Sequence, residues 1–166
     1  MSRINVGQYN LINEDVIIED GASVGNFNVI ASGTIIRSGA VVGNYCEIGK
    51  NNDIGENSIV QGRIRTAEDC IIEKNVTIKY GTILTEGVLL KEGCFLGPHT
   101  ITLGSTHERI TKHGTIIGSN TYIGAGAKIA ADIKIGDNIV VGALGFVNKD
   151  LTEEGTYAGL PVKKIK

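Results

Sequence analysis

The sequence contains no tryptophan, only two prolines and few aromatic residues of any kind, 5% in total. A compact core usually relies on large aromatic side chains, so this chain must fill its interior with aliphatic side chains in a repetitive arrangement. No window approaches the ~20 apolar residues of a membrane span. The N-terminal stretch MSRINVGQYNL lacks the apolar core of a signal peptide. We therefore expect neither a membrane span nor export.

The net charge is also small and the cysteines are few. The formal net charge is −2, with basic residues scattered among acidic ones, which gives no electrostatic footprint for nucleic acid. Three cysteines without an export signal favour a reducing, cytoplasmic location and argue against a disulfide framework. The only basic cluster is KKIK, residues 163–166, which taken alone is typical of a solvated terminus.

Aliphatic residues recur with a period of six. From Val6 to Thr102 and again from Ile117 to Val147, 21 of 23 positions on this grid are Ile, Val or Leu, although these residues make up only 47 of 166 in the chain. The next grid position is often glycine. The fifth position is mostly small and includes all three cysteines: Cys46, Cys70 and Cys94. We therefore interpret the cysteines as small residues that line a core.

A period of six suits neither the 3.6-residue period of a helix nor the alternation of a flat strand. It indicates a short strand followed by a corner, with three such units closing a triangular coil and each coil covered by its neighbours. The 23 hexads predict seven to eight coils stacked over ~37 Å, with parallel strands paired between coils. Glycine is expected where a side chain would crowd the backbone or φ must be unusual. We predict one all-β domain over residues 1–166, with a C-terminal tail over residues 152–166.

The grid breaks between Thr102 and Ile117, whose separation along the sequence is not a multiple of six. The solenoid must therefore eject a loop, predicted over residues 105–116, and insertions from repeat scaffolds tend to carry function. All three histidines of the chain lie in or beside this loop. We place His99 on the preceding coil, His107 where the loop leaves the coil, and His113 inside the loop.

The run from Gly97 to the C-terminus resembles the C-terminal half of hexapeptide-repeat acetyltransferases. Its matching features, in order, are GP before a strand, a TH pair, an excursion, YIGAGA, VVGALGFVNKD and AGLPVKKI. The run is similar to maltose and galactoside O-acetyltransferases, and more loosely to nucleotide-amino-sugar N-acetyltransferases. The resemblance implies a left-handed parallel β-helix, a homotrimer and acetyl-CoA bound in the groove between neighbouring prisms, with no metal.

The resemblance also implies roles for single residues. His107 is the expected general base, which suits an imidazole because it can accept a proton near neutral pH. His99 is expected on the acceptor side, with the two histidines able to exchange roles, and Glu108 is a further acceptor or orienting contact. The remaining matches imply binding of CoA. The small residues Gly124, Ala125 and Ala143 are expected beside the pantetheine arm. The pair Asn148 and Lys149 is expected near the end of the groove, and Lys163 near the nucleotide phosphates.

The acceptor that the resemblance implies depends on where this sequence differs from the simple-sugar enzymes as well as on where it matches them. His99 and Leu160 stand where the simple-sugar enzymes commonly carry Asn, and Tyr122 stands where Trp is frequent. Hexads also occupy nearly the whole sequence from Val6 onward. The resemblance therefore points to a nucleotide-linked amino sugar used for surface polysaccharide, with a simple sugar of the maltose or galactoside type as the alternative.

Two other classes remain open. Some trimeric β-helices are gamma-class carbonic anhydrases, whose zinc is held by three histidines, but the histidine spacings of eight and six here do not match theirs. A non-catalytic scaffold on the same repeats is the second alternative, because a fold does not by itself determine a function.

Overall fold

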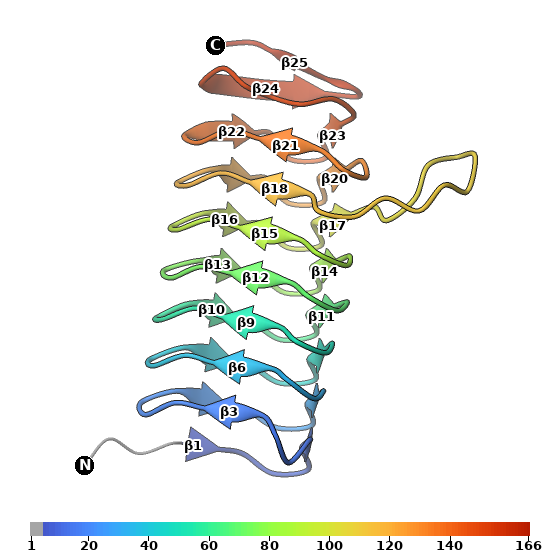
Figure 1. Cartoon of the computed structure of the whole chain (residues 1–166). Helices are drawn as coiled ribbons and strands as arrows, with labels where there is room; N and C mark the ends of the chain where they lie inside the picture. The colour runs from blue at the N-terminus through green and yellow to red at the C-terminus, as the bar shows by residue number, and fades with distance from the viewer. Residues whose placement is uncertain (1–4) are drawn as a thin grey trace.

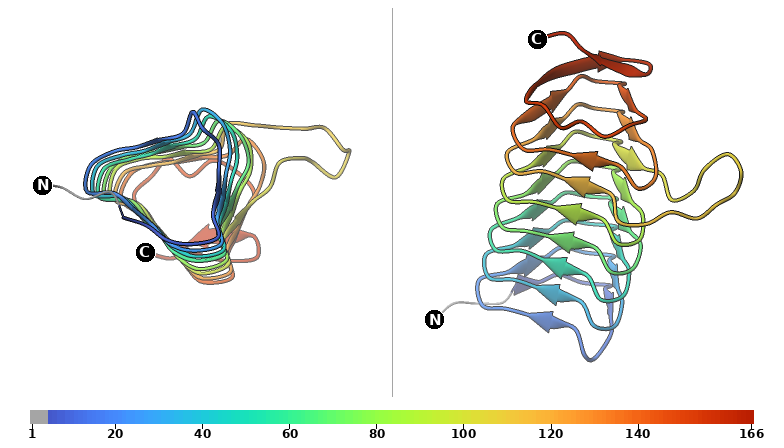
Figure 2. Two further views of the ribbon diagram at one scale, coloured as in Figure 1. Left: turned by 90° about the horizontal axis from the view of Figure 1, so that it is seen from below. Right: turned by 45° about the horizontal axis from the view of Figure 1, so that its top comes forward.

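The computed structural model describes residues 5–166 as a β-solenoid without helices among them. Each coil has three short strands separated by three corners, and the coils stack into a prism that is triangular when viewed along its axis (Figures 1 and 2). In Figure 1 the nearer strands run to the left and the farther strands to the right as the chain rises, so the coil is left-handed. The predicted left-handed parallel β-helix is confirmed.

Three sheets form the faces of the prism. The first sheet contains β1 (Asn5–Val6), β4 (Ser23–Val24), β7 (Val41–Val42), β10 (Ile59–Val60), β13 (Thr77–Ile78), β16 (Phe95–Leu96), β19 (Tyr122–Ile123), β22 (Ile139–Val141), β24 (Gly155–Gly159) and β25 (Val162–Lys164). The second contains β2 (Leu11–Ile12), β5 (Val29–Ile30), β8 (Glu47–Ile48), β11 (Arg65–Thr66), β14 (Ile83–Leu84), β17 (Ile101–Thr102), β20 (Lys128–Ile129) and β23 (Phe146–Val147). The third contains β3 (Ile17–Ile18), β6 (Ile35–Ile36), β9 (Asp53–Ile54), β12 (Ile71–Ile72), β15 (Leu89–Leu90), β18 (Ile116–Ile117) and β21 (Lys134–Ile135).

We name the corners by the sheets that they join. The first corner joins the first sheet to the second, as at residues 97–100; the second joins the second sheet to the third, as at residues 85–88; the third closes the coil, as at residues 91–94. Strand partners are normally three hexads apart in the sequence, as in Ile59 with Thr77, whereas Leu89 pairs with Ile116, which lies farther along the chain by the length of the insertion. The insertion therefore adds residues at a second corner without changing the parallel register.

The aliphatic grid forms the core. From Val24 to Val147 every grid side chain is buried, including the two threonines of the grid, Thr66 and Thr102, whereas Val6 in the first coil is 42% exposed. The second residue of each two-residue strand points inward because successive strand side chains face opposite sides of a sheet. The period predicted from the sequence is thus the geometric repeat of the prism.

The small residues of the fifth column have a shared task at the corners. Hydroxyl side chains in this column hydrogen-bond to backbone carbonyls of the following coil: Thr34 Oγ1 donates to Gly49 O at 3.0 Å, and Ser58 Oγ donates to Glu73 O at 2.8 Å. Two of the thiols do the same, with Cys46 Sγ 3.0 Å from Gln61 O and Cys70 Sγ 3.2 Å from Thr85 O. These bonds satisfy buried carbonyls that the two-residue strands leave unpaired. The prediction that the cysteines line the core is confirmed.

Burial of the cysteines predicts their reactivity. Desolvation raises the pKa of Cys94 to about 12 and that of Cys70 to about 11, and it also raises the pKa of Cys46, from an ordinary value of 9.0. The thiolate is the nucleophile, so we expect all three thiols to resist a disulfide reagent at pH 8 in the folded protein and to react at once in urea.

The same pKa shifts predict a loss of stability in alkali. Because the folded pKa values lie above the unfolded ones, the unfolded chain releases these protons first as the pH rises. The free energy of unfolding is therefore expected to be insensitive to these groups below pH 9.0 and to fall as the pH rises toward the folded values of about 11 and 12. Urea titrations at increasing pH check this; thiols titrated fully in the folded state near pH 8 would contradict it.

Glycine follows many of the aliphatic grid residues because a side chain at that position would clash with the next coil, and not because φ is unusual there. A Cβ added to Gly97 would lie 2.6 Å from the backbone nitrogen of Ala125 in the next coil. Positive φ occurs elsewhere, at corner residues such as Tyr9, Phe27 and Tyr45, each at 58°. Their rings stack between coils with centroids 4.9 and 5.0 Å apart.

The C-terminal segment predicted as a tail is instead largely built into the first sheet. β24 pairs in parallel with β22, and β25 returns antiparallel to β24. Leu151, Tyr157 and Val162 are buried beneath this hairpin, and the Tyr157 hydroxyl donates to Glu153 O at 2.8 Å. The hairpin closes the C-terminal end of the core (Figure 1).

Candidate active site

The insertion is an arm that leaves the prism at a second corner. It spans residues 103–115, between β17 and β18, so Ile116 of the predicted loop belongs to a strand instead. Its two sides pair locally, because Lys112 N donates to Gly104 O and Thr106 N donates to Ile110 O, both at 2.9 Å. The arm projects well beyond the prism in both views of Figure 2.

His107 lies at the distal turn of this arm, and the prediction that it sits where the loop leaves the coil is wrong. The extra residues pair with each other before the coil resumes, and this pairing carries residues 107 and 108 outward. The His107 side chain is 93% exposed, and its nearest carboxylate is that of Glu108, 3.9 Å away. Within residues 5–166, nothing else forms a hydrogen bond or ion pair with this imidazole. The His107 imidazole is therefore open to solvent at the tip of the arm.

His99 is on a different corner. It occupies the first corner with φ of 58°, and its ring meets that of Tyr80 edge-on with centroids 5.7 Å apart. The imidazole lies over Gly81, where an added Cβ would be 2.5 Å from Nδ1. Within one chain the structure therefore does not bring His99 and His107 together.

The small residues predicted to contact CoA share the first corner with His99. Ala125 and Ala143 are both exposed there, in successive coils, and Leu144 N donates to Ala125 O at 2.8 Å. Gly124 is buried, and a Cβ on it would overlap the backbone nitrogen of Ala143. The two alanines are available to a ligand, whereas Gly124 is needed for stacking of the coils.

Two of the predicted CoA contacts meet at the C-terminal end of the prism. Lys149 and Lys163 line one cleft of about 320 Å³. Lys164 lines it too, but its ammonium is paired with Glu153 at 3.1 Å. Asn148 precedes Lys149 and is exposed beside this cleft. The structure thus brings together two of the predicted cofactor contacts that are distant in the sequence.

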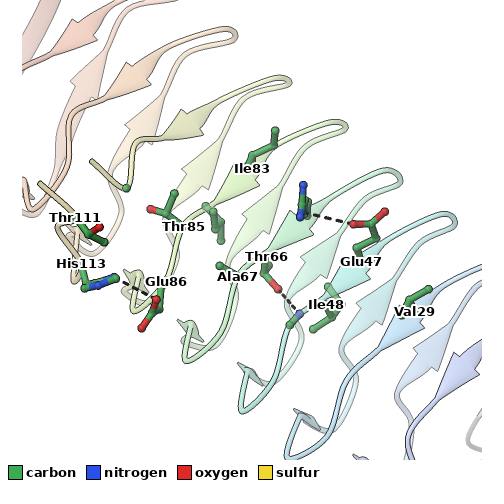
Figure 3. Close-up of a pocket in the computed structure, with 14 residues that line it drawn as sticks. Val29, Glu47, Ile48, Thr66, Ala67, Ile83, Thr85, Glu86, Thr111 and His113 are labelled. Carbon is green, nitrogen blue, oxygen red and sulfur yellow. Dashed lines mark hydrogen bonds and ion pairs between the residues drawn. The ribbon is translucent and has the colours of Figure 1, made fainter. Parts of the chain in front are cut away.

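A larger cleft, of about 640 Å³, lies at the root of the arm, and the sequence did not indicate it (Figure 3). One side carries His113, whose Nδ1 is 3.4 Å from Glu86 Oε2. Glu86 was missed because it is an ordinary corner residue in the hexad pattern. The lengthened offset between Leu89 and Ile116 is what places Glu86 beside the returning arm. In the sequence, only the length of the arm relative to the six-residue repeat could have indicated that Glu86 lies beside His113.

Residues 114–148 match the family model described as bacterial transferase hexapeptide (six repeats). Over these residues the chain carries the hexapeptide repeat of that model. The matched residues start as the arm returns to the prism and end at Asn148. They include four predicted contacts: Gly124, Ala125, Ala143 and Asn148. No curated protein sequence matches the chain.

Solved structures of the hexapeptide-repeat fold cover nearly the whole chain. A variant of GDP-perosamine N-acetyltransferase from Caulobacter crescentus, in complex with CoA and GDP-perosamine, matches 95% of the chain with TM-score 0.51 and 20% identity. A UDP-N-acetylglucosamine acyltransferase from Francisella novicida matches 92% with TM-score 0.59 and 16% identity, and one from Bacteroides fragilis matches 96% with TM-score 0.58 and 17% identity. The chain spans 56%, 66% and 69% of these proteins, respectively.

Across residues 5–166, no three His, Cys, Asp or Glu side chains gather closely enough to hold a metal ion. The same part of the chain includes no helix of the length and apolar character needed to cross a membrane.

Proposed function

We propose that this chain is an acetyl-CoA-dependent acetyltransferase acting on an amino or hydroxyl group of a sugar. The observation that carries the proposal is a histidine held at the end of an arm, on a prism whose C-terminal coils match the transferase hexapeptide model. The fold shared with acyltransferases that act on nucleotide sugars supports it. The proposed acceptor is a nucleotide-linked amino sugar made in the cytoplasm for surface polysaccharide.

His107 is the proposed general base. The acceptor nitrogen or oxygen attacks the thioester carbonyl, the imidazole of His107 takes the proton that the acceptor loses, and the CoA thiolate leaves. The His107 imidazole is open to a ligand at the arm tip, and the turn places Glu108 next to it. Backbone N–H groups would stabilise the tetrahedral intermediate. His99 would then contact the acceptor from the first corner.

A homotrimer is part of the proposal. Among residues 5–166, His107 contacts nothing on the body of the prism, and in the proposed trimer the groove between two prisms would supply its partner groups. In that arrangement the arm of one chain meets the first corner of the next. The exposed Ala125 and Ala143 would line the pantetheine arm, and Asn148, Lys149 and Lys163 would lie toward the CoA phosphates.

Calorimetric titration with CoA and acetyl-CoA tests this function without knowledge of the acceptor. We expect saturable binding of one ligand per chain. Replacing Lys163 with alanine should weaken it about tenfold, because a charge-assisted hydrogen bond to phosphate is lost. Lys91→Ala, which alters a lysine at a third corner, is the matched control and should leave affinity unchanged. Absence of binding at millimolar ligand would contradict the transferase function.

A further inference from the structure

A ladder of stacked side chains runs along the first corner and ends beside a pocket. Tyr9, Phe27 and Tyr45 occupy the third residue of this corner in successive coils, and their rings stack with centroids 4.9 and 5.0 Å apart. Arg63 continues the ladder in the next coil, with its Cζ over the Tyr45 ring at 5.1 Å from the centroid. The next residue in the column is Gly81, which has no side chain to add. The ladder therefore stops at a guanidinium.

A pocket of about 520 Å³ lies where the ladder stops. Tyr45, Arg63 and Tyr80 line it on the corner. Val41 and Ile59, which are directly paired on β7 and β10, form its apolar floor on the outer face of the first sheet. The rings of Tyr45 and Tyr80 are 50% and 44% exposed, so a ligand can reach both.

Gly62 keeps this pocket open. The same corner position carries Asn26 and Asn44 in the two preceding coils, where Asn44 Oδ1 accepts a hydrogen bond from Asn26 N at 2.7 Å. At Gly62 no side chain continues this row, and Tyr80 lies over the space, with its Cδ2 atom 3.7 Å from an added Cβ. Gly62 does not have a positive φ, and the nearest backbone atom to an added Cβ is Asn44 O at 3.1 Å. Stacking of the coils therefore requires a glycine less strictly here than at Gly97.

The lining suits a flat ring that is linked to an anionic group. Tyrosine rings and guanidinium planes are the groups on which nucleobases stack. Arg65, two residues beyond the ladder, is paired with Glu47, whereas Arg63 lies on the ladder, and the described residues that line the pocket include no Asp or Glu. The Arg63 guanidinium can therefore contact a base and also attract a phosphate. Asn44 and Gln61 add amide groups that can hydrogen-bond to the edge of a base.

We propose that this pocket binds the nucleobase of the acceptor nucleotide against Arg63 and Tyr80, so that the linked sugar reaches His99. The inference rests on the proposed function and assigns a place to the base of its acceptor. Tyr80 meets His99 edge-on, with centroids 5.7 Å apart, so the pocket adjoins the proposed acceptor contact. Arg63 lies two coils before His99, or ~10 Å at the spacing of paired strands, a length that a ribose and two phosphates can span.

The reacting end of this acceptor would lie where the proposed function needs it. His99 and the arm belong to the same coil, because the arm follows β17, the strand directly after the corner that carries His99. In a trimer of parallel prisms, the arm of a neighbouring chain would meet the first corner at the level of His99. The base would then be held by one chain, and His107 of the next chain would take the proton from the sugar.

Fluorine NMR of protein labelled with 3-fluorotyrosine tests the pocket with three probes: UDP, GDP and pyrophosphate, which lacks a base. The chain has five tyrosines, so single Tyr→Phe variants assign the signals. We expect a nucleoside diphosphate to shift the Tyr45 and Tyr80 signals saturably at millimolar concentration, and pyrophosphate to bind at least about tenfold more weakly. Absence of a saturable shift with both UDP and GDP, or equal binding of pyrophosphate, overturns the proposal.

Variants separate the pocket from general surface charge. Arg63→Ala should raise the Kd of the bound diphosphate at least about tenfold, because a stacking plane and a cation are lost together. Arg65→Ala is the matched control, since Arg65 is 70% exposed and does not line the pocket. Gly62→Asn, which restores the side chain of the two preceding coils, should also weaken binding by filling the space beneath Tyr80. Equal effects of Arg63→Ala and Arg65→Ala would contradict a specific site.

Titration with CoA distinguishes this inference from the function on which it rests. CoA binding, without a Tyr45 or Tyr80 shift by UDP or GDP, would overturn the pocket and leave the transferase in place. A shift by a diphosphate without CoA binding in calorimetry would overturn the transferase and leave a nucleotide pocket. Signals that respond to CoA and not to UDP or GDP would assign the pocket to the adenine of CoA and overturn the proposal.

Kinetics supply a second readout once an acceptor is in hand. Arg63→Ala should raise KM for that acceptor at least about tenfold and leave kcat nearly unchanged, since the group acts in binding. KM for acetyl-CoA should not change. A loss confined to kcat would contradict a binding role for Arg63.

Discussion

Replacement of His107 by alanine is expected to lower kcat at least ~100-fold, the lower range for loss of a general base. The physical reason is that the alanine cannot take the proton from the attacking amine or hydroxyl group. The side chain is 93% exposed, so the substitution should not affect folding. Steady-state assays with acetyl-CoA and a panel of nucleotide-linked amino sugars measure the effect.

Three controls accompany this variant. Calorimetry should show unchanged CoA affinity, and native mass spectrometry should show an unchanged trimer. Arg109→Ala alters a nearby residue of the same turn, and it should reduce kcat far less than His107→Ala if the imidazole itself is the base. Activity that survives His107→Ala would remove His107 from the mechanism and direct attention to His99. A trimer that dissociates would show that the arm acts in assembly.

Replacement of Gly118 by alanine is expected to lower the free energy of unfolding by about 3 kcal/mol, the upper part of the usual range for overpacking. A Cβ at this position would overlap the backbone carbonyl of Gly136 in the next coil. Backbone atoms cannot rotate away as a flexible side chain can, so the two coils must separate locally. Urea unfolding followed by circular dichroism measures the loss.

Gly136→Ala provides the matched control for this effect. Gly136 occupies the same column one coil later, but its nearest contact for an added Cβ is Leu151 O at 3.3 Å. We expect a loss of no more than about 1 kcal/mol there. Equal losses at Gly118 and Gly136 would point to glycine propensity rather than to coil stacking as the cause.

The fold could be predicted from the sequence because each hexad encodes the same local structure. One aliphatic residue faces the core, one small residue bonds to the next coil, and one glycine lets backbones approach, as Ile54, Ser58 and Gly55 do within a single unit. Each coil is covered only by its neighbours, so nearly all contacts follow from the period. The role of the cysteines followed from the same pattern.

The site was only partly predictable. Lys149 and Lys163, which the resemblance assigned to CoA binding, line one cleft in the structure, although they are distant in the sequence. His107, by contrast, is at the arm tip, because the arm folds on itself through pairs such as Thr106 with Ile110. The six-residue repeat does not extend into the insertion, so it could not predict this pairing. The homotrimer and the assignments of His107, His99 and the CoA contacts remain proposals to be tested as described.

The sequence by itself determined the prism, its parallel register and the place of the interruption, because a six-residue period fits a short strand followed by a corner. The left hand of the coil was implied by the resemblance. Only the tertiary structure decided what the interruption does in space. The arm lengthens the pairing offset beyond the usual three hexads, and that change sets His113 against Glu86 above a cleft while sending His107 outward. The physical reason is that side chains meet across coils, so their neighbours depend on the length of chain between them rather than on local sequence.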